Sequence, residues 1–152
     1  MINSDLCLHK VLYFETDRMG IVHHSNYIRW MEEGRLEYMR LNGVDYLDIE
    51  NSGILMPVVS IDCKYKTSAR FGDTAEIQTK LTYYNGVRMG FEYQIFMNNK
   101  TVLLCEGHSE HCFIDAASRS PVNLKKRMPD VSEHIYAVLA QEKKVKNTKS
   151  LI

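Results

Sequence analysis

Residues 75–97 read AEIQTKLTYYNGVRMGFEYQIFM, and this stretch decides the fold. Apolar and polar side chains alternate on both sides of Asn85-Gly86, which is typical of strands that bury one face and expose the other. An Asn-Gly pair between two such runs is a strong signal for a two-residue hairpin turn. The stretch therefore predicts two long antiparallel strands joined by a tight turn.

A helical pattern precedes this hairpin, in residues 26–41, NYIRWMEEGRLEYMRL. Trp30 and its apolar neighbours recur every three or four residues and form one face of a helix. Asn42-Gly43 is a good C-terminal stop, and Ser25 or Asn26 is expected to cap the start. The rest of the chain predicts a short helix over 44–51, a C-terminal helix over 131–144, and strands over 8–15, 54–67 and 101–115, the last after a turn at 98–99.

The lengths of these elements predict how they pack. A strand of about twelve residues spans roughly 40 Å, so it must twist and bend, and the helix that carries Trp30 is available for it to wrap around. Gly107 and Ser109 would let that helix approach the sheet closely. We expect an α+β fold, one long helix cradled by a curved five-stranded antiparallel sheet. The single domain spans 1–152, with its core at about 8–129 and a lysine-rich flexible tail at 145–152.

Composition excludes several classes of protein. The 152 residues carry 19 Lys and Arg against 19 Asp and Glu, without the basic excess that nucleic-acid binders use to neutralise phosphates. The longest apolar run, 54–59, is too short to span a membrane, and the N-terminus lacks a signal-peptide pattern. The four cysteines form no CxxC pair and indicate reduced thiols in a cytoplasmic protein.

Residues 13–32, YFETDRMGIVHHSNYIRWME, carry a more specific signal. This segment resembles the opening motif of the hotdog-fold acyl-CoA thioesterases, and most of all the 4-hydroxybenzoyl-CoA thioesterase-like family. The resemblance extends over about 8–129. It implies homodimers with two active sites at the subunit interface, often paired into homotetramers. One departure is His23, since the family commonly has an aromatic residue there, which leaves the shape of the acyl pocket open.

The resemblance implies that Asp17 is the catalytic carboxylate. From the residues alone, the more ordinary interpretation of Asp17 is an Asx turn near a helix start. The first N–H groups of a helix have no partner within it, and the resemblance implies that the N–H of His24 polarises the thioester carbonyl. Asp17 would then attack the carbonyl or activate water, two routes that stay open. Gly20 would let the backbone bend beside the thioester, and Asn26 would hold the loop.

Other residues are assigned to binding. We expect the acyl group to meet Tyr13, His23, Tyr27, Val58, Val59 and Ser60, the last three from the partner subunit. Cationic side chains suited to the phosphates of coenzyme A are Lys64, Lys66, Arg70 and Arg88. Glu33 on the long helix is a rival catalytic carboxylate. No metal site is expected, because the spacing of His108 and His111 points their side chains to opposite faces of a strand.

The predicted function is hydrolysis of an acyl-CoA to a free carboxylic acid and CoA, without a cofactor. Two alternatives remain. The first is an acyl-ACP thioesterase of fatty-acid or polyketide metabolism, which would have an acyl carrier protein as partner. The second is a hotdog protein that binds acyl-CoA without catalysis.

Overall fold

The computed structural model describes residues 6–151 of the chain. Its helices are α1 (Ser25–Leu41), α2 (Tyr46–Asn51), α3 (Leu124–Arg127) and α4 (Pro129–Ser150). Its strands are β1 (Cys7–Lys10), β2 (Ile54–Leu55), β3 (Val58–Tyr65), β4 (Thr74–Tyr84), β5 (Arg88–Met97), β6 (Val102–Cys112) and β7 (Ile114–Asp115), and a 3-10 turn covers Tyr13–Glu15.

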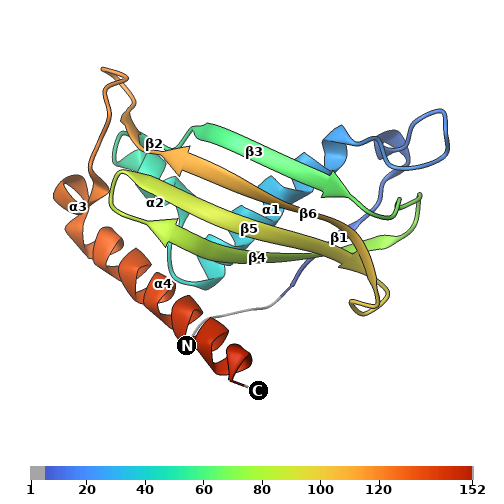
Figure 1. Cartoon of the computed structure of the whole chain (residues 1–152). Helices are drawn as coiled ribbons and strands as arrows, with labels where there is room; N and C mark the ends of the chain where they lie inside the picture. Colours follow the sequence, from blue (N-terminus) through green and yellow to red (C-terminus); the bar gives the residue numbers. More distant parts are fainter. Residues whose placement is uncertain (1–5, 152) are drawn as a thin grey trace.

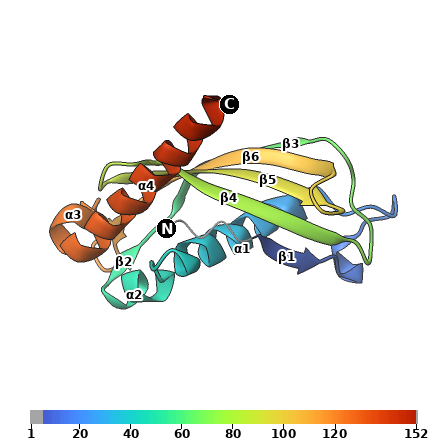
Figure 2. The ribbon, with the colours of Figure 1, turned by 90° about the horizontal axis from the view of Figure 1, so that it is seen from below.

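Five strands form one antiparallel sheet in the order β1-β4-β5-β6-β3, which curves around α1 (Figures 1 and 2). The predicted fold class is therefore confirmed. The contact face of α1 is fully buried at Trp30 and Met31, which lie against the concave side of the sheet. No helix within residues 6–151 is both long and apolar enough to cross a membrane.

The turns follow the sequence pattern. The Asn85 side-chain oxygen accepts the N–H groups of Val87 (2.9 Å) and Arg88 (2.8 Å), and Gly86 takes a φ of 91° that a side chain would resist. At the second turn, Asn98 and Asn99 both have a φ of 55°, a region that asparagine tolerates well. Both predicted hairpins are confirmed.

Three predicted strands are wrong in extent, one of them the strand expected over 101–115, which is interrupted at Phe113 between β6 and β7. The strand expected over 8–15 ends at Lys10, because the carboxylate of Glu15 accepts the N–H of Leu12 (2.8 Å) and curls the chain into the 3-10 turn. The strand expected over 54–67 is split at Pro57, which has no N–H to donate to a ladder. Its first part, β2, pairs with β7, and its second part, β3, pairs with β6.

The C-terminal helix is longer than predicted. It begins at Pro129 and continues to Ser150, so the prediction that it ends at 144 is wrong. Lysine, at positions 143, 144, 146 and 149, is a good helix former, and the polar composition of residues 145–150 does not end the helix. β1 pairs only with residues 74–77 of β4, and α4 packs against β4. The helix therefore lies at a sheet edge that β1 leaves without a partner strand (Figure 2).

A chain of buried polar groups crosses the core between α1 and the sheet. Arg35 donates to the hydroxyl of Tyr93 (3.1 Å), which is bonded to the Ser109 hydroxyl (2.6 Å), and this in turn to Nε2 of His111 (2.8 Å). His111 has no exposed surface, and burial together with the charge of Arg35 lowers its pKa to about 4 from 6.5. His111 is therefore neutral in the folded protein at neutral pH.

This buried histidine predicts a loss of stability in acid. The unfolded chain binds a proton at His111 below pH 6.5, and the folded chain does so only below about pH 4. The stabilising contribution of the neutral ring is complete above pH 6.5 and disappears as the pH falls toward 4, a loss of up to about 3 kcal/mol. Urea unfolding of wild type and His111→Gln between pH 7 and pH 4 measures this difference. Parallel pH curves for the two proteins would contradict it.

Candidate active site

Asp17 lies on a loop that is closed at its base. Thr16 and Val22 form an isolated antiparallel bridge, and the N–H of Asp17 donates to the carbonyl of Ile21 (2.9 Å). Gly20 donates to the Asp17 carbonyl (3.0 Å) and has a φ of 76°, so the tight turn of this loop requires a residue without a side chain. Oδ1 of Asp17 accepts the N–H of Met19 (2.8 Å), which is the Asx turn expected on local grounds. The other carboxylate oxygen accepts no hydrogen bond from residues 6–151.

Helix α1 begins directly after this loop. His24 is its N-cap residue and its side chain makes no capping bond, so the prediction that Ser25 or Asn26 caps the helix is wrong. The first helical N–H, that of Ser25, donates to Nδ1 of His23 (3.3 Å). The Asn26 side chain instead donates to the carbonyl of Glu15 (2.8 Å), and the Ser25 hydroxyl is bonded to the ring of His23 (2.8 Å). The N–H of His24 donates to no other described residue, so it is a free donor at the positive end of the helix.

Asp17 and His24 line the same cavity, which has a volume of about 200 Å³. Tyr65 closes one side, where its hydroxyl donates to the His24 carbonyl (2.9 Å), and burial raises the pKa of this phenol to about 12. The hydroxyl of Tyr27 accepts the N–H of Ala69 (3.0 Å), and burial raises its pKa as well. Both phenols are therefore neutral. The remaining walls are Met19, Ile21, Val22, Lys66, Thr67 and Ser68.

This arrangement brings together the two groups that thioester hydrolysis needs. Asp17 and His24 line one space together with the neutral phenols of Tyr27 and Tyr65, and within residues 6–151 one carboxylate oxygen of Asp17 and the N–H of His24 have no hydrogen-bond partner. Such a site can hold a carbonyl against a donor while a carboxylate, or a water next to it, approaches the carbon.

Several predicted binding residues lie outside this cavity within one chain. Tyr13, expected to meet the acyl group, is 76% exposed, contacts Phe71 ring to edge and does not line this cavity within one chain. The ring of His23 stacks on His24 at 4.1 Å and is exposed. Val58, Val59 and Ser60 lie at the far end of β3, roughly 16 to 23 Å along the strand from Tyr65.

The cationic residues divide into two groups. Lys66 lines the cavity, and Arg70 reaches the carbonyl of Gly20 (3.4 Å), so these two lie near the Asp17 loop. Lys64 is exposed near the same end of β3. Arg88 begins β5 beside Cys112, at the opposite end of the sheet, where it pairs with Glu110 at 3.5 Å. Within one chain, the structure does not bring Arg88 to the site.

The rival carboxylate, Glu33, does not line this cavity. Glu33 lines a different groove, beside β1 and α2, and its carboxylate faces the ring of His9 (2.9 Å).

Cys63, Cys105 and the two histidines of β6 supply neither a reactive thiolate nor a metal site within residues 6–151. Burial raises the pKa of the Cys63 and Cys105 thiols, so they are protonated at neutral pH. His108 and His111 lie on opposite faces of β6, as their spacing predicted, and residues 6–151 hold no group of three potential ligands placed to bind a metal.

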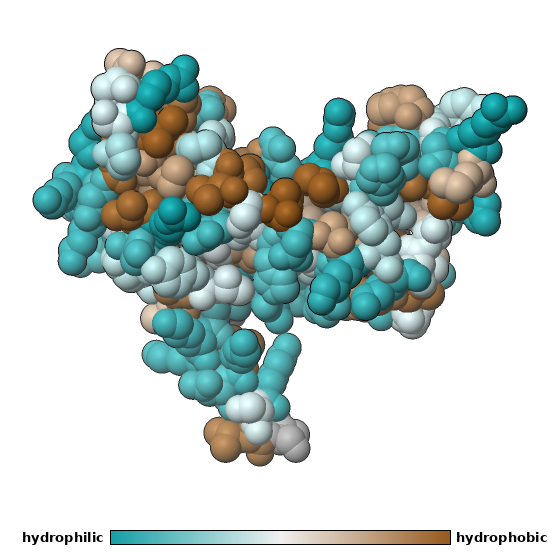
Figure 3. Space-filling model, turned by 45° about the horizontal axis from the view of Figure 1, so that its top comes forward, coloured by the Kyte–Doolittle hydropathy of each residue, from teal (hydrophilic) through white to brown (hydrophobic). Residues whose placement is uncertain are grey.

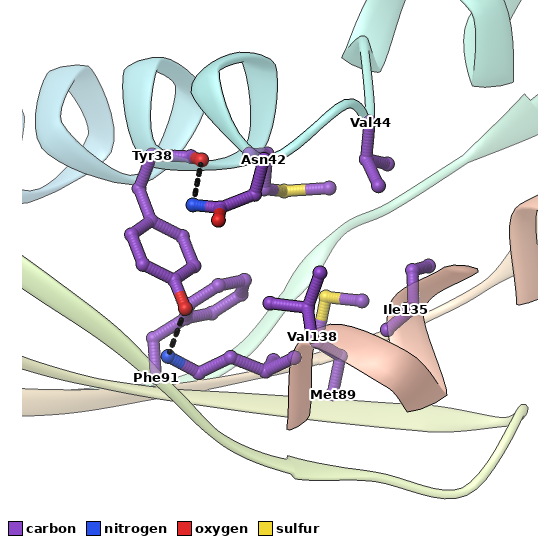
Figure 4. Close-up of a pocket in the computed structure, with 9 residues that line it drawn as sticks. Tyr38, Asn42, Val44, Met89, Phe91, Ile135 and Val138 are labelled. Carbon is purple, nitrogen blue, oxygen red and sulfur yellow. Dashed lines mark hydrogen bonds between the residues drawn. The ribbon is translucent and has the colours of Figure 1, made fainter. Parts of the chain in front are cut away.

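A second enclosed space lies where the end of α1 meets β5 and α4 (Figure 4). Its volume is about 10 Å³, room for about one water molecule and none for an acyl group. The hydroxyl of Tyr38 donates to Glu142 of α4 (2.6 Å) and accepts the N–H of Leu81 (3.4 Å). This space is a packing defect of the core and not a substrate site. Its wall includes Val44, Met89, Phe91, Ile135 and Val138.

The sequence pattern did not single out Glu15 and His9, which lie directly behind the Asp17 loop. Glu15 is only 6% exposed, and both of its carboxylate oxygens lie within 3.0 Å of Nε2 of His9. The sequence held one local indication of this buried position: Glu15 is an acidic residue that directly follows the apolar run ending at Phe14, within a segment expected to be a strand.

Comparisons with known proteins place the chain among thioesterases. The sequence model of the thioesterase-like superfamily matches residues 11–139. YneP of Bacillus subtilis (strain 168), named as a candidate acyl-CoA thioesterase, is 40% identical over 121 residues, which cover 80% of this chain and 87% of YneP. The acyl-CoA thioesterase YbgC of Haemophilus influenzae is 25% identical over 127 residues, 83% of this chain and 92% of YbgC.

A solved structure shows the same fold. The DHNA-CoA thioesterase from Staphylococcus aureus superposes with a TM-score of 0.87 at 30% identity, covering 92% of this chain and 93% of that one. The family match spans most of the chain, and it includes the Asp17 loop, α1 and the whole of β3 to β6. The chain therefore belongs to the thioesterase-like superfamily of hotdog-fold thioester hydrolases, which confirms the family, fold and enzyme class that its sequence predicted.

Proposed function

We propose that this chain hydrolyses the thioester of an acyl-CoA to a free carboxylic acid and CoA, with Asp17 as the catalytic carboxylate. One observation carries the proposal: Asp17, which has a carboxylate oxygen without a partner among residues 6–151, and His24, whose N–H donates to no described residue, line the same cavity at the start of α1. The relatives named as acyl-CoA thioesterases support the choice of substrate class.

The proposed reaction begins with the thioester carbonyl oxygen at the N–H of His24. The donor and the positive end of α1 stabilise the negative charge that develops on this oxygen as the carbon is attacked. Asp17 either attacks the carbon itself, giving a mixed anhydride that water then cleaves, or removes a proton from the water that attacks. The C–S bond breaks and the thiolate of CoA leaves; a free thiol has a pKa near 8.5, so this group needs little help from an acid. Neither route requires a cofactor.

The proposed working form is at least a homodimer, and we expect two dimers to pair as a homotetramer. The outer edge of β3 has no partner strand within residues 6–151, and Val58 and Val59 on it are 49% and 45% exposed. Figure 3 shows hydrophobic side chains gathered in a band across this face. If two copies pair β3 antiparallel, Val58–Ser60 of one copy lies opposite the Tyr65 end of the other, next to the cavity.

The cations at the loop suit the nucleotide part of the substrate. Lys66 lines the cavity and Arg70 contacts the Asp17 loop at Gly20, and their charges would bind the phosphates of CoA. Lys64 would extend this rim. A contribution from Arg88 is proposed only across the subunit interface, since it lies at the far end of its own sheet.

The experiment that tests this function is thiol release from a panel of substrates. The panel contains straight-chain acyl-CoAs of increasing length and 1,4-dihydroxy-2-naphthoyl-CoA (DHNA-CoA). It also contains one acyl group in two forms, as the CoA thioester and as the ACP thioester. We expect turnover of at least one acyl-CoA, at a rate above that of the same acyl group on ACP. Faster turnover of the ACP substrate would support the carrier-protein alternative. Tight binding of acyl-CoA without any turnover would mean that the protein is a binder and not an enzyme.

The rival carboxylate gives a separate prediction. Glu33 is 45% exposed and lines a groove other than the one that holds Asp17. We therefore expect Glu33→Gln to keep kcat within about threefold of wild type, because a group that cannot reach the substrate contributes no general-base catalysis. A loss of a hundredfold in the thiol-release assay would transfer the catalytic role to Glu33.

A further inference from the structure

Glu15 is a buried carboxylate just two residues before the proposed catalytic Asp17. Its side chain does not line the cavity, yet every contact it makes is with a donor. Oε1 accepts the indole N–H of Trp30 (2.9 Å), and Oε2 accepts the backbone N–H of Leu12 (2.8 Å). Nε2 of His9 lies between the two oxygens, at 3.0 and 2.9 Å. The carboxylate is thus held from three segments of the chain.

The backbone of Glu15 holds two further groups. Its carbonyl oxygen accepts the N–H of His23 (2.8 Å) and the side-chain amide of Asn26 (2.8 Å). His23 is the last residue before the N-cap of α1, so this bond joins the two ends of the loop that carries Asp17. Glu15 therefore connects β1, the 3-10 turn, both ends of the loop and α1.

The loop between Thr16 and Val22 is held by its own backbone bonds and by Arg70, but its tip is exposed. Met19 is 73% exposed, and Arg18 and Gly20 are exposed as well. A buried carboxylate is costly unless it is paired and hydrogen bonded. Burial alone would raise the pKa of Glu15, but its bonds from Leu12, His9 and Trp30 outweigh burial and lower it. The Glu15 carboxylate is therefore ionised, and both of its oxygens accept hydrogen bonds. It thus forms a rigid base, or anchor, for the loop that carries Asp17.

We propose that Glu15 is a positioning residue for the reaction: it sets the placement of the Asp17 carboxylate relative to the N–H of His24. This inference rests on the proposed function. Catalysis is sensitive to displacements of about 1 Å in such a pair. Loss of the anchor should therefore lower kcat, while the cation rim and the cavity walls that bind the substrate keep KM nearly unchanged.

Glu15→Gln is the primary test because it keeps the size of the side chain. An amide offers one acceptor oxygen where the carboxylate offers two, and its NH₂ group must face a donor, the N–H of Leu12, His9 or Trp30. We expect a loss of roughly 10- to 100-fold in kcat for the acyl-CoA that wild type hydrolyses best, with KM within about threefold. Trp30→Phe, which removes one donor and keeps an aromatic ring, should lower kcat by roughly three- to tenfold.

A double-mutant cycle separates positioning from general damage. If Glu15 acts through Asp17, then Glu15→Gln added to Asp17→Asn should change the residual kcat by less than about twofold. If the double variant loses the same factor that Glu15→Gln costs in wild type, Glu15 acts independently of Asp17 and the inference is wrong.

A matched control accounts for lost stability. Tyr84→Phe removes another buried hydrogen bond, from Tyr84 to Ser132 (2.7 Å), on the packing surface of α4 and away from the loop. Its kcat should stay within about twofold of wild type at temperatures where all variants are folded. If Glu15→Gln does not fold, the same cycle with Trp30→Phe decides the question.

The outcomes distinguish the two proposals. Full activity of Asp17→Asn would overturn the proposed function, whatever Glu15 does. If Asp17→Asn is inactive while Glu15→Gln and Trp30→Phe are folded and keep the kcat of wild type, the proposed function stands and only the positioning inference is wrong.

Discussion

Asp17→Asn should lower kcat for acyl-CoA hydrolysis by roughly a hundredfold or more, the effect expected when a general base or nucleophile is removed. The substitution isolates chemistry from structure. Oδ1 of Asp17 accepts the N–H of Met19, and an asparagine oxygen can accept the same bond and keep the Asx turn. The measurement is thiol release under saturating substrate, together with the melting temperature of each protein.

The stability of this variant decides how the result is interpreted. We expect a melting temperature close to that of wild type, because the turn survives and Asp17 is only partly buried on a loop. If the variant is inactive but has the melting temperature of wild type, the result supports a catalytic role for Asp17. A variant that is as active as wild type would reduce Asp17 to a turn residue and would overturn the proposed mechanism.

Gly107→Ala should lower the free energy of unfolding by about 2–4 kcal/mol, a large share of the stability of a domain of this size. Gly107 lies in β6 opposite Cys63 of β3. A Cβ atom placed there would lie 2.2 Å from the backbone oxygen of Asp62 and 2.9 Å from the end of the Met31 side chain. Methionine can move, but a backbone oxygen can yield only if β3 separates from β6. Urea unfolding monitored by Trp30 fluorescence measures the change.

Gly53→Ala is the matched control for this substitution. Gly53 has a φ of 85°, so alanine there is strained, but nothing lies within 4 Å of its added Cβ. We expect a cost of about 1 kcal/mol from backbone strain alone. Equal losses in the two variants would show that close approach of the strands does not explain Gly107. A loss of oligomeric state in Gly107→Ala alone is a further expected result, since β3 is the proposed subunit edge.

The sequence was most informative where structure depends on near neighbours. The alternation on both sides of Asn85-Gly86 and the three- and four-residue spacing around Trp30 predicted the main sheet and helix. These patterns succeed because side-chain period and turn chemistry are local properties. Prediction failed at element ends. The strand predicted over 8–15 stops early because the Glu15 carboxylate accepts the N–H of Leu12. The spacing of apolar residues carries no information about such a hydrogen bond.

The candidate site shows the same division. The motif around Asp17 and His24 was visible in the sequence because its members are close along the chain. Its surroundings were not: Tyr65 reaches His24 across 41 residues, and the Glu15 anchor depends on His9 and Trp30. Arg88, grouped with Lys66 and Arg70 by charge, lies at the other end of the sheet because antiparallel register decides which strand ends meet.

By itself, then, the amino-acid order determined the class of fold, the position of the turns and the loop that carries the acidic residue. Tertiary structure alone decided which side chains share the cavity and which cations lie near it, and it showed that a buried glutamate supports the loop. The physical reason is distance along the chain. Periodicity and turn preference act over a few residues, whereas burial and hydrogen-bond partners arise only when segments tens of residues apart pack together.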